Sequence, residues 1–240
     1  IEDTFRHIDW IAQSFDAGPA MDDSGAIDCA RTLAEAEAMA RRNAGRLDAE
    51  AEFLRRAGVS IVASDSASFP LAAAARAGLP SAAVANFTWL EIFAPYAKDS
   101  PRHAALLRQM RREYEQASLA IVPGLDVPMP AFRRQWRAPI VARQGRSIRS
   151  ALARSLKLDT RLPWLLFYPG NLGFPFDWQA LRAARALFLV FAPPPRPVEN
   201  VISLAGVRVR DPDAVASVDG AIAKPGYGIV GECLACRTPL

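Results

Sequence analysis

Apolar residues recur through the first quarter of the chain at the spacing of one helical face. Between residues 28 and 57 the sequence is rich in Ala, Glu, Arg and Leu, and Leu33, Leu47 and Leu54 fall on one side of a helix. This period predicts one long amphipathic helix. Gly58 follows it, and glycine is a frequent residue just past the C-terminus of a helix.

Short apolar or β-branched runs alternate with helical segments along the rest of the chain. The predicted strands cover residues 59–65, 81–87, 119–123, 164–168, 187–192, 201–204 and 220–223. The predicted helices cover residues 71–77, 102–117, 147–158, 211–217 and 228–236. The β-branched run at 59–65 is typical of a buried strand. Strands that alternate with helices predict parallel sheets in an α/β protein.

The length and composition fit a globular protein with a sizeable core. The chain has 240 residues, of which 51% are hydrophobic and 22% charged, and this length exceeds the usual size of one domain. A Pro-rich stretch at residues 128–130 comes before the second group of strands. We expect two doubly wound Rossmann-like units, an N-terminal one at residues 1–145 and a C-terminal one at residues 146–240.

Charge is distributed unevenly along the chain. Residues 1–52 hold twelve acidic and five basic side chains, whereas residues 131–157 hold eight basic and no acidic ones. A basic segment attracts phosphates, nucleic acids or anionic membranes. It fits equally a solvated helix face followed by a linker, and it lacks a recognisable nucleic-acid-binding motif. We expect no nucleic-acid partner.

Several classes of protein are disfavoured by the sequence. No apolar stretch approaches the roughly 20 residues of a membrane-spanning helix, and no signal-peptide pattern opens the chain, so we expect a cytoplasmic protein without a membrane span. The three cysteines give no disulfide framework. Cys233 and Cys236 lack a second ligand pair, which favours small core residues over a zinc site. Neither His7 nor His103 stands in a nucleophile-elbow pattern, so a hydrolase triad has no support.

Candidate binding residues follow the ends of predicted strands, because ligands of open α/β sheets bind outside the carboxyl ends of the strands. They are Asp65, Asn86, Phe87, Thr88, Trp89, Gly170, Asn171, Lys224, Pro225, Gly226, Tyr227 and Gly228. The glycine-containing turn at 224–228 opens a helix, where backbone N–H groups and the helix dipole suit a diphosphate. Glu232 lies one turn further and is placed to accept hydrogen bonds from a pair of sugar or ribose hydroxyls.

Each candidate also has a structural explanation. Asp65 fits an N-cap or a turn, and Trp89 fits the core. Gly226 and Gly228 fit a tight strand-to-helix turn without any phosphate. No one of these residues decides the function by itself.

Longer segments of the sequence form a recognisable series. They are residues 61–65, Pro70, 72–75, 78–81, 84–89, 128–132, 139–141, 219–224, 226–228 and Glu232. In this order they resemble the glycosyltransferase-like N-terminal region of L-arabinokinases and its free-standing bacterial relatives. The Asn-Phe-Thr-Trp segment at 86–89 and the Lys-Pro-Gly-Tyr-Gly segment at 224–228 are the most specific parts. More distantly, the last segment resembles the donor-binding helix of the N-acetylglucosaminyltransferases of peptidoglycan synthesis.

The resemblance implies a GT-B type of fold with two Rossmann-like units, truncated at both ends. Members of this class begin with a strand and a Gly-x-Gly-His loop, and they continue past the position of Leu240. They carry Thr or Ser in the last helix where Ile229 and Gly231 stand here, which leaves phosphate binding to the backbone. We therefore expect a fragment or a defective copy, with exposed sheet edges that favour self-association.

The function implied by the resemblance is transfer of a sugar from a nucleotide-diphosphate sugar, such as a UDP-sugar, to an unknown acceptor. The donor-binding residues would be Gly170, Asn171, Lys224, Gly226, Tyr227, Gly228 and Glu232. The acceptor-binding residues would be Asp65, Asn86, Phe87 and Trp89, with Asp65 as the catalytic candidate. Neither a cofactor nor a metal is expected, because a helix N-terminus and basic side chains can stabilise the leaving diphosphate. The alternatives are a nucleotide-sugar-binding module without transferase activity and an inactive fragment.

Overall fold

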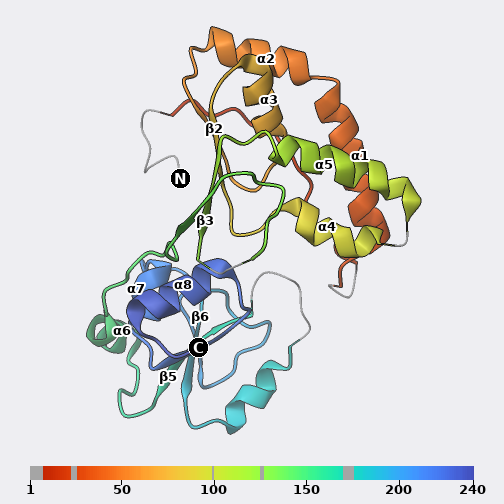
Figure 1. The fold of residues 1–240 in the computed structure, drawn as a ribbon. Coiled ribbons are helices and arrows are strands. Elements are labelled where there is room, and N and C mark those ends of the chain that lie inside the picture. The colour runs from red at the N-terminus through yellow and green to blue at the C-terminus, as the bar shows by residue number, and fades with distance from the viewer. Residues whose placement is uncertain (1–7, 23–25, 99, 125–126, 170–175) are drawn as a thin grey trace. The chain divides into compact units, whose positions relative to one another are not determined.

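A computed structural model of the 240-residue chain describes residues 8–22, 26–98, 100–124, 127–169 and 176–240. They belong to two compact units, residues 1–139 (unit 1) and residues 140–240 (unit 2) (Figure 1). Each unit has its own four-stranded sheet and its own hydrophobic core. The predicted α/β fold with two parallel sheets is therefore confirmed.

The sheet of unit 1 is parallel, with strand order β1-β2-β3-β4. Its strands are β1 (Val62–Ser64), β2 (Ser81–Val84), β3 (Leu119–Pro123) and β4 (Gln135–Ala138). Strand β3 coincides with its prediction, and β1 and β2 are shorter than predicted. Alternate residues share a face of the sheet, and on one face Ala83, Ala120 and Val122 are almost inaccessible to solvent.

The helices of unit 1 are α1 (Cys29–Ala44), α2 (Leu47–Arg56), α3 (Phe69–Ala77), α4 (Trp89–Ala97), the 3-10 helix η1 (Pro101–His103) and α5 (Ala104–Tyr114). Of these, α1, α3, α4 and α5 contribute side chains to the core cluster that includes this buried face, whereas α2 packs against α3. Figure 1 shows α1, α4 and α5 close together on one side of β2 and β3, and all three contribute side chains to the same core cluster.

The single long helix predicted over residues 28–57 is wrong, because the chain breaks it into α1 and α2. Gly45 ends α1, and its backbone N–H donates to Arg41 O at 3.2 Å. Arg46 leaves the helical backbone region (φ −117°, ψ 4°) before α2 begins. Glycine is about 1 kcal/mol less favourable than alanine inside a helix, so a break at this position costs little. The apolar period continues across the break, which is why the pattern did not predict it.

The start and end of α3 follow the sequence signals. Pro70 stands in its first turn, and Gly78 caps it in the left-handed conformation at φ 76°. Helix α4, in contrast, was not predicted. It carries Pro95 in its interior, and a proline at that place normally argues against a helix.

One prediction at the edges of this sheet is wrong and another is incomplete. Strand β1 is not buried, because it is an edge strand in which Ala63 is exposed, and Ile61 just before it is 59% exposed. Residues 131–157 are more than a helix face and a linker, because they include the opposite edge strand β4. Trp136 of β4 is 57% exposed. Within the described residues, β1 pairs only with β2 and β4 only with β3, whereas the hydrophobic pattern assumes two neighbours for each strand.

Unit 2 has strand order β7-β6-β5-β8, again with parallel pairing. Its strands are β5 (Trp164–Tyr168), β6 (Leu187–Val190), β7 (Val201–Ser203) and β8 (Gly220–Ala223). Its helices are α6 (Arg149–Leu156), the 3-10 helix η2 (Trp178–Ala183), α7 (Asp211–Val215) and α8 (Tyr227–Cys236). All of these elements except η2 were predicted, with ends that differ by a few residues.

Both faces of the sheet of unit 2 are covered. Trp164 and Leu166 of β5 face one core cluster, to which α6, α7 and α8 contribute. Phe167 and Phe188 face a second cluster on the other side, against which Trp178 of η2 packs. Burial on both sides explains why the strands of unit 2 are continuous apolar runs.

Candidate functional site

A hollow of about 400 Å³ opens in unit 2 beside the start of helix α8. Its lining residues are Arg143, Tyr168, Phe191, Asp211, Val215, Gly228, Ile229 and Glu232. Tyr168 is the last residue of β5, and α8 follows the end of β8, so the hollow lies at the carboxyl edge of the sheet. Parallel α/β sheets bind ligands at this edge, and the volume suits a small organic molecule.

Helix α8 begins without a side-chain cap on its first backbone N–H groups. Its N-cap residue is Gly226, with φ −82° and ψ 148°. Since Gly226 and Gly228 both have negative φ, a strained turn does not explain these two glycines. A Cβ at Gly228 would meet no heavy atom within 4 Å. Open space therefore lies beside N–H groups that are able to receive an anion.

Glu232 lies one turn into α8, and its side chain is only 8% exposed. Its Oε1 accepts hydrogen bonds from Arg143 Nε at 3.0 Å and from Arg143 Nη2 at 2.7 Å. The same Nη2 lies 3.6 Å from Asp211 Oδ2. The hydrogen bond to Glu232 raises the pKa of Arg143 above its ordinary value, so the guanidinium stays charged. The hollow thus combines one guanidinium with two carboxylates.

Arg143 belongs to an irregular segment, residues 140–148, which we call the strap. Val141 N–H donates to the hydroxyl of Tyr227 at 2.9 Å. Gly145 passes so close to α7 that a Cβ there would overlap the helix backbone. Two further bonds run from Arg146 N to Asp213 Oδ1 at 2.9 Å and from Ile148 N to Ser217 Oγ at 2.8 Å. The strap is therefore held against α7 and α8 on both sides of Arg143.

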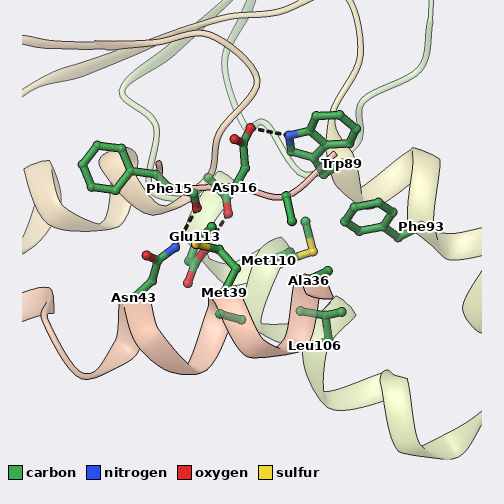
Figure 2. A pocket seen from close by; sticks show the side chains of 13 residues that line it. Phe15, Asp16, Ala36, Met39, Asn43, Trp89, Phe93, Leu106, Met110 and Glu113 are labelled. Carbon is green, nitrogen blue, oxygen red and sulfur yellow. Dashed lines mark hydrogen bonds between the residues drawn. The ribbon is translucent and has the colours of Figure 1, made fainter. Parts of the chain in front are cut away.

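In unit 1, Phe87 is the predicted acceptor residue that the structure shows in contact with Trp89. The indole Nε1 of Trp89 donates to Asp16 Oδ2 at 2.6 Å, its ring stacks on Phe93 with 5.5 Å between centroids, and Phe87 meets it edge-on. Figure 2 shows the side chains around the adjacent pocket, with Asp16 turned toward the indole. The free volume of this pocket is about 30 Å³, which is room for a water molecule or two and not for a sugar.

The backbone at the start of α4 is also held by internal hydrogen bonds. Trp89 N–H donates to the hydroxyl of Tyr114 at 3.1 Å, and that hydroxyl donates to Ser66 O at 2.6 Å. Burial raises the pKa of Tyr114, so the hydroxyl keeps its proton. Thr88 is fully buried and its hydroxyl bonds to the carboxylate of Glu91. Packing therefore accounts for Trp89, while its role in acceptor binding stays a prediction, as does that of the half-buried Asn86.

Asp65 follows β1 and is exposed. Its Oδ1 accepts a hydrogen bond from Ser66 Oγ at 3.1 Å, and its carbonyl accepts from Ala67 N at 2.7 Å, as in a turn. The N-cap of α3 is Ser68, so the N-cap explanation of Asp65 is wrong. Asp65 lines a second hollow of unit 1, of about 340 Å³, together with Phe15. Its catalytic role stays a prediction.

The structure brings together only part of the predicted donor set. Gly228 and Glu232 line the hollow, and Tyr227 lies at its side with its hydroxyl bound to the strap. Lys224 is exposed, and its backbone N–H donates to Tyr168 O at 3.0 Å. Gly170 and Asn171 lie outside the described residues.

Six of the eight lining residues were not among the predicted site residues, and three of the six, Arg143, Tyr168 and Asp211, are polar. Tyr168 ends a strand, so the rule about strand ends was sufficient to find it. Asp211 is the first residue of α7 and does not directly follow a strand, so the rule about strand ends did not select it. Arg143 is 89 residues from Glu232 in sequence, and the sequence marked it only as one member of a basic run.

The described residues show neither a metal cluster nor a membrane-crossing helix. No group of three or more His, Cys, Asp or Glu side chains in the described ranges could hold a metal ion. Cys233 is buried, and burial raises the pKa of its thiol. It belongs to the core cluster of unit 2, against which Cys236 packs, as expected for small core residues. None of the helices in this part of the chain has the length and apolar character needed to cross a bilayer.

Comparison with known proteins gives a similar curated protein and similar solved structures. No protein-family model matches the sequence. The chain is 30% identical over 204 residues to L-arabinokinase of Arabidopsis thaliana, a match that covers 80% of this chain and 19% of that protein. The chain thus spans about a fifth of the length of this curated relative.

Two solved structures share the fold across almost the whole chain. One is a UDP-glucosyltransferase from Polygonum tinctorium capable of glucosylating indoxyl, with TM-score 0.57 and 17% identity over 95% of this chain and 66% of that one. The other is the glycosyltransferase SnogD from Streptomyces nogalater, with TM-score 0.51 and 17% identity over 92% of this chain and 67% of that one. This chain spans about two thirds of each.

The protein has a GT-B type of fold, in which two Rossmann-like units each carry a parallel sheet. The resemblance to the N-terminal part of L-arabinokinases is confirmed by the match to the Arabidopsis thaliana protein.

Proposed function

We propose that this protein transfers a sugar from a nucleotide-diphosphate sugar to an acceptor, and that the donor binds in the hollow beside α8. One observation carries the proposal. The hollow at the carboxyl edge of the sheet of unit 2 combines an uncapped helix N-terminus with the carboxylate of Glu232, 8% exposed, one turn further along. The similarity in fold to two glycosyltransferases supports the same choice.

Each part of a nucleotide-diphosphate sugar has a suitable partner around this hollow. The diphosphate would accept hydrogen bonds from the first N–H groups of α8, where the positive end of the helix dipole favours an anion. The absence of a side chain at Gly228 lets a phosphate approach the backbone. Glu232 would accept hydrogen bonds from two neighbouring hydroxyls of the ribose or the sugar. Tyr168 and Phe191 contact each other edge-on and supply apolar surface.

The transfer step needs a base for the acceptor hydroxyl and stabilisation of the leaving diphosphate. Asp65 is our candidate for the base, because its carboxylate is exposed at the end of a strand of unit 1. The hydroxyl oxygen of the acceptor would form the new bond to the anomeric carbon as the bond to the diphosphate breaks, and its proton would pass to the base. The α8 N-terminus and Lys224 would stabilise the charge that develops on the diphosphate. No metal is required by this scheme.

Binding of nucleotides to the 240-residue chain tests the donor site. Calorimetric titration with UDP, GDP and dTDP and their glucose conjugates should reveal one preferred base. Glu232→Ala should weaken that binding by about 1–3 kcal/mol, the cost of removing a charged hydrogen-bond partner. The control is Glu199→Ala, because Glu199 is another acid of unit 2 that, unlike Glu232, is exposed and lines a separate hollow near the start of β6. Equal affinity in the wild type and Glu232→Ala would remove the site from consideration.

A second candidate function is binding of a nucleotide sugar without transfer. Among the described residues, His103 is the one histidine, and its ring Nδ1 lies 2.6 Å from Glu37 Oε1. His103 lines neither the hollow beside α8 nor the hollow beside Asp65, so the described residues place no imidazole in either hollow, which favours binding alone. Release of UDP from a labelled donor in the presence of a panel of acceptors separates the two functions. Turnover that disappears in Asp65→Asn while donor affinity is kept would support transfer.

A further inference from the structure

We infer that Arg143 is a positioning residue, which holds the carboxylate of Glu232 in the orientation that binds the vicinal hydroxyls of a nucleotide ribose. The inference rests on the proposed function, because it assumes that a nucleoside diphosphate occupies the hollow beside α8. It adds a residue that no sequence motif marks and gives its contribution a specific chemical target, the ribose diol.

The first observation that supports this inference is the contact between the side chains of Arg143 and Glu232. Both hydrogen bonds from the guanidinium end on Oε1 of Glu232, at 3.0 Å from Nε and 2.7 Å from Nη2. Two bonds from a planar donor restrict rotation of the carboxylate. With Oε1 engaged by Arg143, Oε2 is the oxygen that remains to accept from a ligand hydroxyl.

The second observation is that the strap is fixed in place, so the backbone from which Arg143 extends is also fixed. Val141 and Gly145 lie on either side of Arg143, and the first bonds to Tyr227 while the second fits against α7 only because it lacks a Cβ. A Cβ at Gly231 would lie 3.0 Å from the Cβ of Ala142, so the strap also lies directly on α8. An arginine on a fixed backbone can set the position of its partner, whereas one on a mobile loop cannot.

The exposure of the two side chains decides which variants are informative. The Arg143 side chain is 67% exposed, whereas that of Glu232 is 8% exposed. Because removal of Arg143 leaves a buried carboxylate without its charged partner, Arg143→Met should lower stability as well as free the direction in which Glu232 points. Arg143→Lys keeps a positive charge beside Glu232 but cannot make both hydrogen bonds, so it separates a loss of orientation from a loss of stability.

The local charges argue against Arg143 as a direct diphosphate ligand. Asp211 Oδ2 lies 3.6 Å from Nη2, and Glu232 bonds to the same nitrogen, so two carboxylates already face one guanidinium. A diphosphate at that nitrogen would have to displace them and would meet their negative charge. The N-terminus of α8 carries no such competition in its first turn, which has no acidic residue.

The experiment compares two ligands that differ only in the diol. UDP and 2′,3′-dideoxyuridine diphosphate are titrated calorimetrically into the wild-type chain, Arg143→Met, Arg143→Lys and Glu232→Gln. Arg146→Met is the matched control, because Arg146 is an exposed arginine of the same strap whose described hydrogen bond uses only its backbone N–H. Thermal melting of each variant checks that it is folded.

We expect the wild type and Arg146→Met to prefer UDP over the dideoxy nucleotide by about tenfold, the scale of one charge-assisted hydrogen bond. Arg143→Met should reduce that preference to about threefold or less, with unchanged affinity for the dideoxy nucleotide. Glu232→Gln should also reduce it, and Arg143→Lys, which keeps one donor and the charge, should fall between Arg143→Met and the wild type.

Three results would count against the inference in different ways. An undiminished preference for UDP in Arg143→Met would show that Arg143 serves only to attach the strap. An equal loss of affinity for both nucleotides would make it a diphosphate ligand instead. Failure of the wild type to bind any nucleoside diphosphate would overturn the proposed function and this inference with it.

Discussion

The candidate residues at 86–89 in unit 1 and at 224–228 in unit 2 were chosen by the same rule, their position after a predicted strand, and the structure gives them different surroundings. Around Trp89 the polar groups bond to one another, and about 30 Å³ remains free. Around Glu232 a carboxylate and a guanidinium face about 400 Å³ of open space.

The difference teaches that position after a strand is not enough to make a binding site. The indole of Trp89 is stacked on Phe93 and bonded to Asp16, so its surface is already used. At α8, Gly228 supplies no side chain, and the space that a larger residue would fill stays open. A binding site differs from a core in having small residues, such as Gly228, beside polar groups that can still form hydrogen bonds, such as the first N–H groups of α8.

The largest expected effect is on the folding of unit 1. Trp89→Ala should lower the free energy of unfolding by about 3 kcal/mol, because it removes a stacked ring and leaves a cavity. Urea unfolding followed by circular dichroism measures this, and UDP affinity should be unchanged. The control is Trp136→Ala, at a ring that is 57% exposed on an edge strand. Unchanged stability together with lost acceptor binding would make Trp89 a binding residue after all.

Tyr114→Phe should lower the free energy of unfolding by about 1–3 kcal/mol, because Trp89 N–H and the carbonyl of Ser66 both lose a buried partner. Folding raises the pKa of Tyr114 above its ordinary value of 10.0. The stabilisation linked to its proton is therefore full below pH 10 and declines as the pH rises further. Urea unfolding at pH 8 and pH 11 should show a smaller alkaline loss in Tyr114→Phe than in the wild type. Equal losses would contradict this assignment.

Gly228→Ala should act in opposite directions on stability and on binding. Alanine is favoured over glycine within a helix, and no atom obstructs its Cβ, so unfolding should become about 0.5–1 kcal/mol less favourable. The added methyl group lies where we place the diphosphate, so UDP should bind about tenfold more weakly, or by about 1.4 kcal/mol. Thermal melting and calorimetry measure the two effects. Gly45→Ala in unit 1 is the control, and it should leave binding unaltered.

The smallest expected effect comes from Asp16→Asn. The amide oxygen can still accept the bond from Trp89, but the charge that strengthens the bond is lost. We expect a loss of about 0.5–1 kcal/mol in the free energy of unfolding and unaltered nucleotide binding. A larger change in UDP affinity than in stability would contradict the separation of the two pockets.

Much of the fold was predictable because local signals agreed with burial. The apolar run of β5 is buried on both faces, and Pro70 and Gly78 mark the start and end of α3. Where the local sequence signals disagreed with the structure, the predictions were wrong. Gly45 interrupts a helical period that continues beyond it, and Pro95 stands inside α4. Packing of the apolar face of α4 overrides the local preference of Pro95, whereas the break at Gly45 is a local effect of glycine that the continuing apolar period hides.

The sequence by itself determined the α/β alternation, the parallel sheets and the position of Gly228 and Glu232 at the start of a helix, because these depend on the order of residues along the chain. Only the tertiary structure decided which of the candidate residues face open space. Arg143 reaches Glu232 across 89 residues of sequence through a strap held by α7 and α8. Local periodicity carries no information on such a contact, because it depends on how separate elements pack in space.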